Sequence, residues 1–272
     1  MSRLIDRLPM PEKVKERKVI VLSRSRVGTF SLYQALKTLG YTPYHMFEVV
    51  NNGATHLELF AEAIDCKYFG KDKPYGKAEF DKWLANYDAI VEIPQFFIEE
   101  FIEFYPNAKF IFVERDVNAW ARSVNNSVKA MFDASRSFPM NVTQYVDDFV
   151  KGFVHLHNNF EDVMFHGKGV TGGMEEAKRD YISDGEKVKR LAPKGQLLAC
   201  TLEGGFGWEQ ICPFLEKDIP KTPYPRGNAP AEFGELVKTH IAPHIKNSVF
   251  KLLGTVLVPV ISIGLWSYMK TH

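Results

Sequence analysis

The sequence has few cysteines, and they are not spaced as a metal or redox motif. Cys66, Cys200 and Cys212 are scattered over the 272 residues, and no C-x-x-C is present. Disulfide frameworks and structural zinc sites both need several cysteines at characteristic spacings. The pattern therefore argues for a reducing compartment, and we expect neither a disulfide framework nor a bound metal.

The sequence also lacks an excess of either charge. Lysine and arginine total 34, aspartate and glutamate total 33, and the formal net charge is +1. A surface that binds nucleic acid leaves a clear surplus of basic residues in the composition. We therefore expect no nucleic-acid partner for this chain.

No apolar segment of signal-peptide length follows the first methionine. Residues 1–17 are charged and contain Pro9 and Pro11, so we expect a flexible N-terminal arm and no cleaved secretory signal. Residues 18–245 are numerous enough to bury the core of a single α/β domain.

What the sequence does contain is a strand, a tight polar loop and a helix over Lys18–Leu39. Val19–Leu22 is a short apolar run typical of a central parallel strand. Ser23–Gly28 supplies small and cationic residues, and Thr29–Leu39 places leucines on one helical face. This order predicts a βα unit whose loop opens onto a helix N-terminus.

Such a loop can hold a phosphate group. Unpaired N–H groups and the positive end of the helix dipole lie at the N-terminus, Arg26 adds a planar cation, and Thr29 and Ser31 add hydroxyl groups. The alternative is an ordinary βα turn with an exposed arginine. The pattern G-x-x-x-x-G-K-[ST] is absent, with one glycine and with Arg26 in place of the lysine, which weakens an ATPase or kinase interpretation.

A second strand with a charged end supports the hypothesis that this protein binds phosphate groups. Ala108–Asp116 is an apolar run that ends in charge, and Asp116 is suited to cap a following helix. Arg115 would lie at the carboxyl end of that strand and Ser123 about two turns into the helix. Ligands gather at this edge of an open α/β sheet, so the pair could hold a second phosphate.

Several ordered segments resemble the fungal and animal branch of the P-loop sulfotransferase family. The loop Ser23–Leu32 is similar to that branch's G-x-x-R-T-G-T-x-S-L pattern. The further matching segments are Gly40-Tyr41, Tyr44–Met46, Gly76–Leu84, Tyr87–Pro94, Tyr105–Asp116, Gly207–Leu215 and Pro223–Asn228. The resemblance covers roughly residues 18–233, and several motifs in order are more specific than any one of them.

The resemblance implies a three-layer P-loop fold with a mostly parallel sheet, and 3′-phosphoadenosine-5′-phosphosulfate (PAPS) as sulfuryl donor. By position, the 5′-phosphosulfate would be held by the loop residues Ser25, Arg26, Val27, Gly28, Thr29, Phe30 and Ser31. Arg115 and Ser123 would hold the 3′-phosphate, with a further contact from Arg226. The sequence departs from the family pattern at Ser23, where the family has glycine, and at Val27, where it has threonine.

The resemblance also bears on the general base. This branch carries an acid near the end of the strand Ala89–Pro94, and Glu92 stands there. Glu92 is either the base for the acceptor hydroxyl or a salt-bridge partner at the end of the strand. His45 is either catalytic or a partly buried structural histidine. We expect Arg26 to stabilise charge on the leaving group while Glu92 or His45 takes the proton.

The C-terminal segment is the longest uncharged run of the chain. Leu252–Met269 contains no charged residue and would span about 27 Å as a helix. Trp266 and Tyr268 suit a membrane interface, and lysines lie upstream. We expect a membrane anchor over 249–269 with the catalytic domain in the cytosol; a buried helix or one lying on the membrane is the alternative.

Together these observations predict a single-pass membrane sulfotransferase that uses PAPS and a small organic hydroxyl acceptor. Two other interpretations stay open. One is a membrane-tethered relative without catalysis, which the departures at Ser23 and Val27 permit. The other is a nucleotide-dependent kinase or hydrolase with a P-loop, which would need Mg²⁺. The sequence does not identify the acceptor or the oligomeric state.

Overall fold

The computed structural model describes residues 2–226 and 237–271, and in the C-terminal helix it describes side chains mainly up to Thr255. The strands are β1 (Val19–Val21), β2 (Pro43–Tyr44), β3 (Ala89–Val91), β4 (Lys109–Glu114) and β5 (Leu197–Thr201). The helices are α1 (Leu4–Arg7), α2 (Thr29–Thr38), α3 (Met46–Asn51), α4 (Ala54–Tyr68), α5 (Lys77–Trp83), the 3₁₀ turn η1 (Ile93–Phe96), α6 (Ile98–Phe104), α7 (Val117–Arg136), α8 (Met140–Thr143), α9 (Asp148–Phe165), α10 (Gly169–Gly172), α11 (Met174–Leu191), α12 (Trp208–Leu215), the π-helix η2 (Val237–Ile241) and α14 (Ala242–Thr271).

The described strands form one sheet in the order β2-β3-β1-β4-β5, and every pair is parallel. β1 is central: Val19 faces Ala89 of β3 on one side and Lys109 of β4 on the other. All three residues of β1 are fully buried, as expected for a strand covered on both faces. The parallel α/β sheet thus agrees with the expectation from the sequence.

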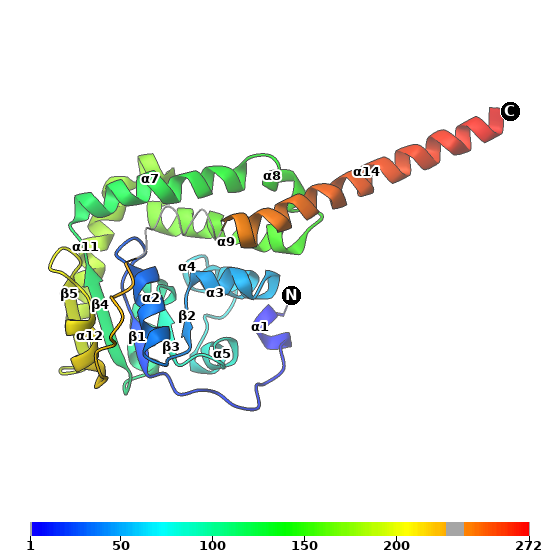
Figure 1. The fold of residues 1–272 in the computed structure, drawn as a ribbon. Helices are drawn as coiled ribbons and strands as arrows, with labels where there is room; N and C mark the ends of the chain where they lie inside the picture. Colours follow the sequence, from blue (N-terminus) through cyan, green and yellow to red (C-terminus); the bar gives the residue numbers. More distant parts are fainter. Residues whose placement is uncertain (1, 227–236, 272) are drawn as a thin grey trace.

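Helices cover both faces of the sheet (Figure 1). The Lys109 ammonium donates to the backbone oxygen of Phe214 in α12, at 2.7 Å. Phe112, on the other face of the same strand because side chains alternate, lies against Gly185 of α11. α11 and α12 therefore sandwich β4, and α12 also packs on α2 through Trp208 and Cys212.

The helices α7 and α9 lie side by side and contribute one wall of the cavity described below. Each has an aspartate cap: Asp116 accepts a hydrogen bond from the Ala119 amide at 2.8 Å, and Asp147 accepts one from the Val150 amide at 3.1 Å. Such caps satisfy N–H groups that have no partner inside the helix. The two helices therefore begin at fixed points, which sets where their side chains meet the sheet.

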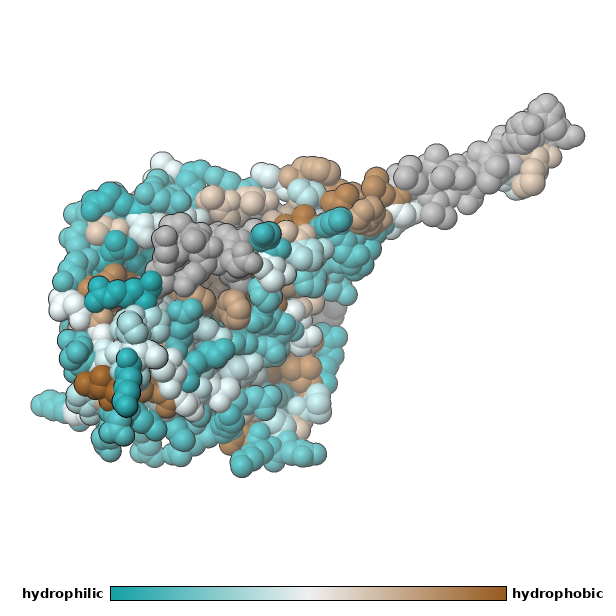
Figure 2. Space-filling view, viewed as in Figure 1, coloured by the Kyte–Doolittle hydropathy of each residue, from teal (hydrophilic) through white to brown (hydrophobic). Residues whose placement is uncertain are grey.

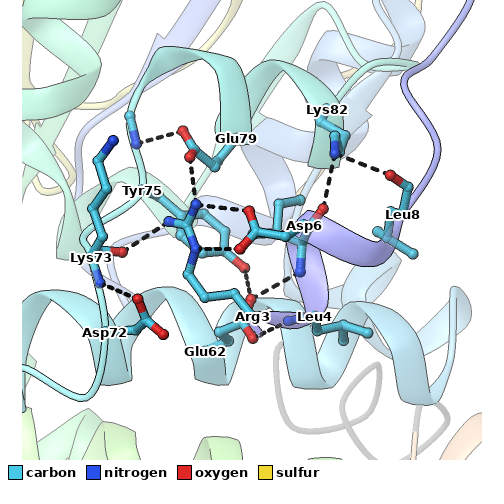
Figure 3. Close-up of polar contacts among 12 residues, drawn as sticks. Arg3, Leu4, Asp6, Leu8, Glu62, Asp72, Lys73, Tyr75, Glu79 and Lys82 are labelled. Carbon is cyan, nitrogen blue, oxygen red and sulfur yellow. Dashed lines mark hydrogen bonds and ion pairs between the residues drawn. The ribbon is translucent and has the colours of Figure 1, made fainter. Parts of the chain in front are cut away.

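Where the sequence predicts a flexible N-terminal arm, the structure has the short helix α1, and Ile5 is fully buried. Figure 3 shows Arg3 between two carboxylates: its Nη2 lies 2.8 Å from both Asp6 and Glu79. Glu62 of α4 accepts hydrogen bonds from the amides of Leu4 and Ile5. These contacts attach the start of the chain to α4 and α5.

The membrane anchor predicted over 249–269 is wrong. Among the helices that the structure describes, none is both long and apolar enough to cross a membrane. The first turns of α14 are instead used for packing: the His244 ring stacks on Phe149 at 3.8 Å between centroids, Ser248 is fully buried, and Lys251 pairs with Asp147. The predictions of a single-pass membrane location, a membrane partner and a cytosolic catalytic domain depended on this anchor, and they are overturned with it.

Part of the predicted anchor, the side chains of residues 256–265 and of Ser267 and Tyr268, lies outside those that the structure describes. Figure 1 shows α14 leaving the body of the molecule beside α8 and α9. Hydrophobic residues gather around that point in Figure 2. Phe138, just before α8, and Phe250 and Leu253 of α14 are exposed. The apolar segment that suggested a membrane anchor therefore begins in the part of α14 that packs against the domain.

Candidate functional site

The loop between β1 and α2 has a backbone that only a few residues favour. Arg26 and Gly28 both have positive φ, at 71° and 89°, a region that is costly for residues with a Cβ. At Gly28 a Cβ would also come within 3.3 Å of Leu202 Cδ1. The first helical bond of α2 runs from Leu32 N–H to Gly28 O, at 3.1 Å, so the earlier amides point out of the helix end.

Two residues beside the loop hold it to the rest of the sheet. The Ser23 hydroxyl, fully buried, accepts a hydrogen bond from the Val113 amide of β4 at 2.7 Å. Arg24 pairs with Asp184 of α11 at 2.7 Å. Ser23 therefore connects the first strand unit to the second at the point where the family pattern has glycine.

The end of β4 brings the second predicted group to the same loop. Arg115 Nη1 donates to the backbone oxygen of Arg26 at 3.2 Å, and Arg26 Nε donates to Ser123 Oγ at 3.4 Å. The Tyr181 hydroxyl accepts from the Arg115 amide at 2.8 Å. Arg26, Arg115 and Ser123, predicted from two separate segments, therefore lie together.

The two arginines leave positive charge at this point. Burial lowers the pKa of Arg26, the nearby Glu92 carboxylate opposes that shift, and Arg115 adds to it. Arg115 Nε is buried and has no hydrogen-bond partner among the described residues; the Glu203 carboxylate oxygen is 3.7 Å away. A bound anion would relieve both the repulsion and the missing hydrogen bond, so these residues fit a phosphate group.

His45 and Glu92 meet at the ends of β2 and β3. Their Nε2 and Oε2 atoms are 2.6 Å apart, although not aligned as a linear hydrogen bond. His45 Nδ1 accepts a hydrogen bond from the Phe47 amide at 3.1 Å and so caps α3. A neutral His45 therefore carries its proton on Nε2, facing the carboxylate.

Glu92 is held in an unusual backbone conformation. Its φ is 72°, and it stands between the end of β3 and the 3₁₀ turn η1. A non-glycine residue with positive φ costs free energy, and such residues cluster at functional sites, although His166 and Glu216 adopt positive φ here as helix C-caps. Arg26 shares this property, so two strained residues face each other across the site.

A cavity of about 180 Å³ joins Arg26 to the His45–Glu92 pair, whereas Arg115 and Ser123 lie outside its lining. From the loop and strand ends it is lined by Ser25, Arg26, Thr29, Phe30, His45 and Glu92. From α7 and α9 it is lined mainly by aromatic and methionine side chains, with Ser127 and His157 as polar members. Enclosed apolar cavities with a few polar groups are typical of small-molecule sites.

Other predicted site residues lie outside this lining. The Val27 side chain is buried in the core, Gly28 contributes backbone at the start of α2, and Ser31 lies in the first turn of α2. Arg226 is exposed and is the last described residue before 227–236. These positions are not part of the cavity wall as the described residues define it.

Sequence reasoning missed Gln95, Ser127 and His157 as members of the cavity lining. Gln95 follows Glu92 on η1, and its side-chain oxygen accepts from the Ser25 amide at 3.3 Å, so its nearness to Glu92 was a usable signal. Ser127 and His157 lie on long helices whose patterns resemble ordinary core packing. Among the described residues, no group of three or more potential metal ligands comes together.

Comparison with known proteins agrees with this geometry. A family model described as a sulfotransferase domain matches residues 18–233. The chain is also similar to "Ava biosynthesis cluster protein M" of Aspergillus versicolor, with 32% identity over 265 residues that cover 92% of this chain and 96% of the relative. The matched segment contains both arginine-bearing strand ends and the His45–Glu92 pair, and the chain belongs to the sulfotransferase domain family.

Proposed function

We propose that this protein transfers a sulfuryl group from PAPS to a hydroxyl group of a small organic acceptor. The observation that carries the proposal is the cavity, which joins Arg26 of the donor loop to the His45–Glu92 pair and to an apolar wall. A transferase needs a donor site, a base and an acceptor pocket in contact with one another. Membership of the sulfotransferase family supports the same conclusion.

The residues at the two strand ends have the chemistry that the donor requires. The first-turn amides of α2 and the Arg26 guanidinium would hold the 5′-phosphosulfate, while Arg115 and Ser123 would hold the 3′-phosphate. The close cations and the unpaired Arg115 Nε support an anion there. Val27 and Ser23, where the sequence departs from the family, are turned to the core and to Val113, so neither need obstruct the loop.

The base in this proposal is Glu92, and His45 is the residue that orients it. Because His45 Nδ1 is occupied by the Phe47 amide, its Nε2–H faces Oε2 of Glu92. The other carboxylate oxygen can then take the proton from the acceptor hydroxyl. The acceptor oxygen bonds to sulfur as the bond from sulfur to the phosphate oxygen breaks, and 3′,5′-adenosine bisphosphate leaves with its charge next to Arg26.

The acceptor in this proposal is a small organic molecule. The cavity of about 180 Å³ is enclosed mainly by apolar side chains, which suits a ring compound better than a polymer. The similar protein of Aspergillus versicolor is named for a biosynthesis cluster, which supports a small molecule as acceptor here.

Thermal unfolding of the full chain with and without 3′,5′-adenosine bisphosphate tests donor binding. A ligand that binds only the folded state raises the unfolding midpoint. We expect a rise for the wild type and for Arg190→Ala, which removes an exposed arginine of α11. For Arg115→Ala we expect an affinity about 10- to 100-fold lower, because a charge-assisted bond is lost.

Sulfuryl transfer is then measured with radiolabelled PAPS and a panel of phenols and alcohols. A folded wild type whose midpoint does not respond to the bisphosphate would contradict the proposal. A response to ATP with Mg²⁺ instead would favour the nucleotide-dependent kinase or hydrolase.

A further inference from the structure

His157 of α9 is a buried histidine on the cavity wall formed by α7 and α9, whereas His45 and Glu92 lie on the wall formed by the strand ends. The His157 residue is 2% exposed, and its ring stacks on Phe153 at 3.9 Å between centroids. Its Nδ1 lies 2.7 Å from the Phe153 backbone oxygen, and its Nε2 lies 2.7 Å from Met131 Sδ.

Both neighbours of the ring nitrogens are hydrogen-bond acceptors. Burial lowers the pKa of His157 to about 4, so the neutral ring has one proton to share between two acceptors. A carbonyl oxygen is a stronger acceptor than a thioether, which places the proton on Nδ1. His157 Nε2 then points an unpaired lone pair at a sulfur that cannot donate to it.

An unpaired buried nitrogen is costly, and a ligand can remove that cost. The group that blocks Nε2 is Met131, whose side chain is unbranched and adapts readily. Of the other residues on this wall, Phe132, Phe153, Phe160 and Met164 are apolar, and the Ser127 hydroxyl already donates to the backbone oxygen of Ser123. Once the Met131 side chain moves aside, a donor on a bound molecule finds an acceptor at Nε2.

We propose that His157 Nε2 accepts a hydrogen bond from a second O–H or N–H group of the acceptor molecule. The substrate class is then a ring compound with a reacting hydroxyl near Glu92 and another donor directed at α9. The assignment of the reacting hydroxyl rests on the proposed function, whereas the hydrogen bond to His157 is a matter of binding alone.

The test compares diphenols with their mono-methyl ethers, which keep size and shape but lose one donor. The three pairs are hydroquinone with 4-methoxyphenol, 2,6-dihydroxynaphthalene with 6-methoxy-2-naphthol, and 4,4′-dihydroxybiphenyl with 4-hydroxy-4′-methoxybiphenyl. The three spacings between the oxygens sample the length of the cavity. Binding is measured by calorimetry in the presence of 3′,5′-adenosine bisphosphate, and transfer by kcat/KM with PAPS.

For at least one pair we expect the wild type to prefer the diphenol about 10-fold or more, in affinity and in kcat/KM. In His157→Phe, which keeps a ring against Phe153, the preference should fall to about two-fold, the statistical value for two equivalent hydroxyls. The control is His155→Gln, which alters a histidine outside the described cavity lining and should keep the full preference.

The outcomes separate this inference from the proposed function. Binding preference that is lost in His157→Phe without any transfer would uphold the hydrogen bond and overturn the enzyme activity. Transfer with equal preference in wild type and variant would uphold the enzyme activity and overturn the hydrogen bond to His157. If the wild type does not distinguish any diphenol from its ether, or binds none of them, the inference is overturned whether or not the variant folds.

Discussion

Two histidine–carboxylate contacts in this molecule use the same chemistry for different ends. At the strand ends, His45 lies 2.6 Å from one oxygen of Glu92, in a backbone with positive φ and beside a cavity. Between α4 and α9, His155 lies 3.1 Å from Glu58 and 2.9 Å from Asp65. The first contact uses one carboxylate oxygen of Glu92. The second uses both ring nitrogens of His155, each facing a carboxylate.

The two contacts differ in how many other partners each carboxylate already has. Asp65 is already engaged by Asn159 and Lys71, each at 2.9 Å, so its contacts hold two helices together. Glu92 instead lines the cavity, and its contact with His45 is through one carboxylate oxygen, Oε2. A similar pair can thus stabilise the fold in one place, whereas in the proposed function the other is placed for proton transfer.

The largest effect that would sharpen this comparison is expected from Glu92→Gln. The amide keeps the size of the side chain but cannot take a proton, so kcat should fall about 10²–10⁴-fold. The rise in unfolding midpoint with 3′,5′-adenosine bisphosphate should persist. A variant with near wild-type kcat would show that Glu92 is only a structural partner of His45.

The matched change in the other pair, Asp65→Asn, should act on stability. It removes the charge that faces His155 and Lys71 in a half-buried network, at a cost of about 2–3 kcal/mol. We expect the unfolding midpoint to fall by about 5–10 °C, with kcat within two-fold of the wild type at a temperature where the variant is folded. A large loss of kcat in that folded variant would break the comparison.

A smaller effect is expected from His45→Asn, because in the proposed function His45 orients the base and does not act as one. The asparagine side chain can still accept from the Phe47 amide and cap α3, but its shorter side chain loses the contact with Glu92. We expect kcat to fall about 10-fold with an unchanged midpoint. If kcat falls as far as in Glu92→Gln, His45 is itself the base.

The smallest effect is a pH dependence that belongs to the α4–α9 contact. Asp65 and Glu58 raise the pKa of His155 to about 9, above the value of about 6.5 in an unfolded chain. The charged contact therefore stabilises the fold fully below pH 6.5, and this contribution is lost as pH rises through 9. Since His155 is partly exposed, solvent screening leaves about 1 kcal/mol.

The measurement is the difference in unfolding midpoint between wild type and His155→Gln. We expect a gap of about 3 °C at pH 6 that closes by pH 10. A gap of equal size at both pH values would mean that His155 contributes through packing and not through its charge.

Much of the sheet was predictable because its signals are local. Val19–Leu22 and Ala108–Glu114 are apolar runs followed by charge, and parallel strands end at one edge. The nearness of Arg26 to Arg115 follows from that rule. To predict the contact between His45 and Glu92, one must also know the register that sets Tyr44 of β2 opposite Ile90 of β3. Because β2 has only two residues, the sequence does not reveal this register.

The α7–α9 wall and the C-terminal helix show why the rest could not be predicted. Phe149, Phe153 and Phe160 recur at helical spacing, and that pattern is the same for a core and for a pocket. Nothing along the chain tells that Met131 of α7 faces His157. Hydropathy likewise favoured a membrane for 249–269, because it does not register that Ser248 and Lys251 are engaged with the domain.

The central position of β1 has a consequence for biogenesis. β1 leaves the ribosome well before its partners β3 and β4, which come later in the chain. The loop after β1 is held through Val113 and Arg115, so it cannot take its final shape on a nascent chain that stops before Glu114. Contacts over such long separations form slowly, and the segment with the clearest family signature therefore cannot become functional before Arg115 has been synthesised.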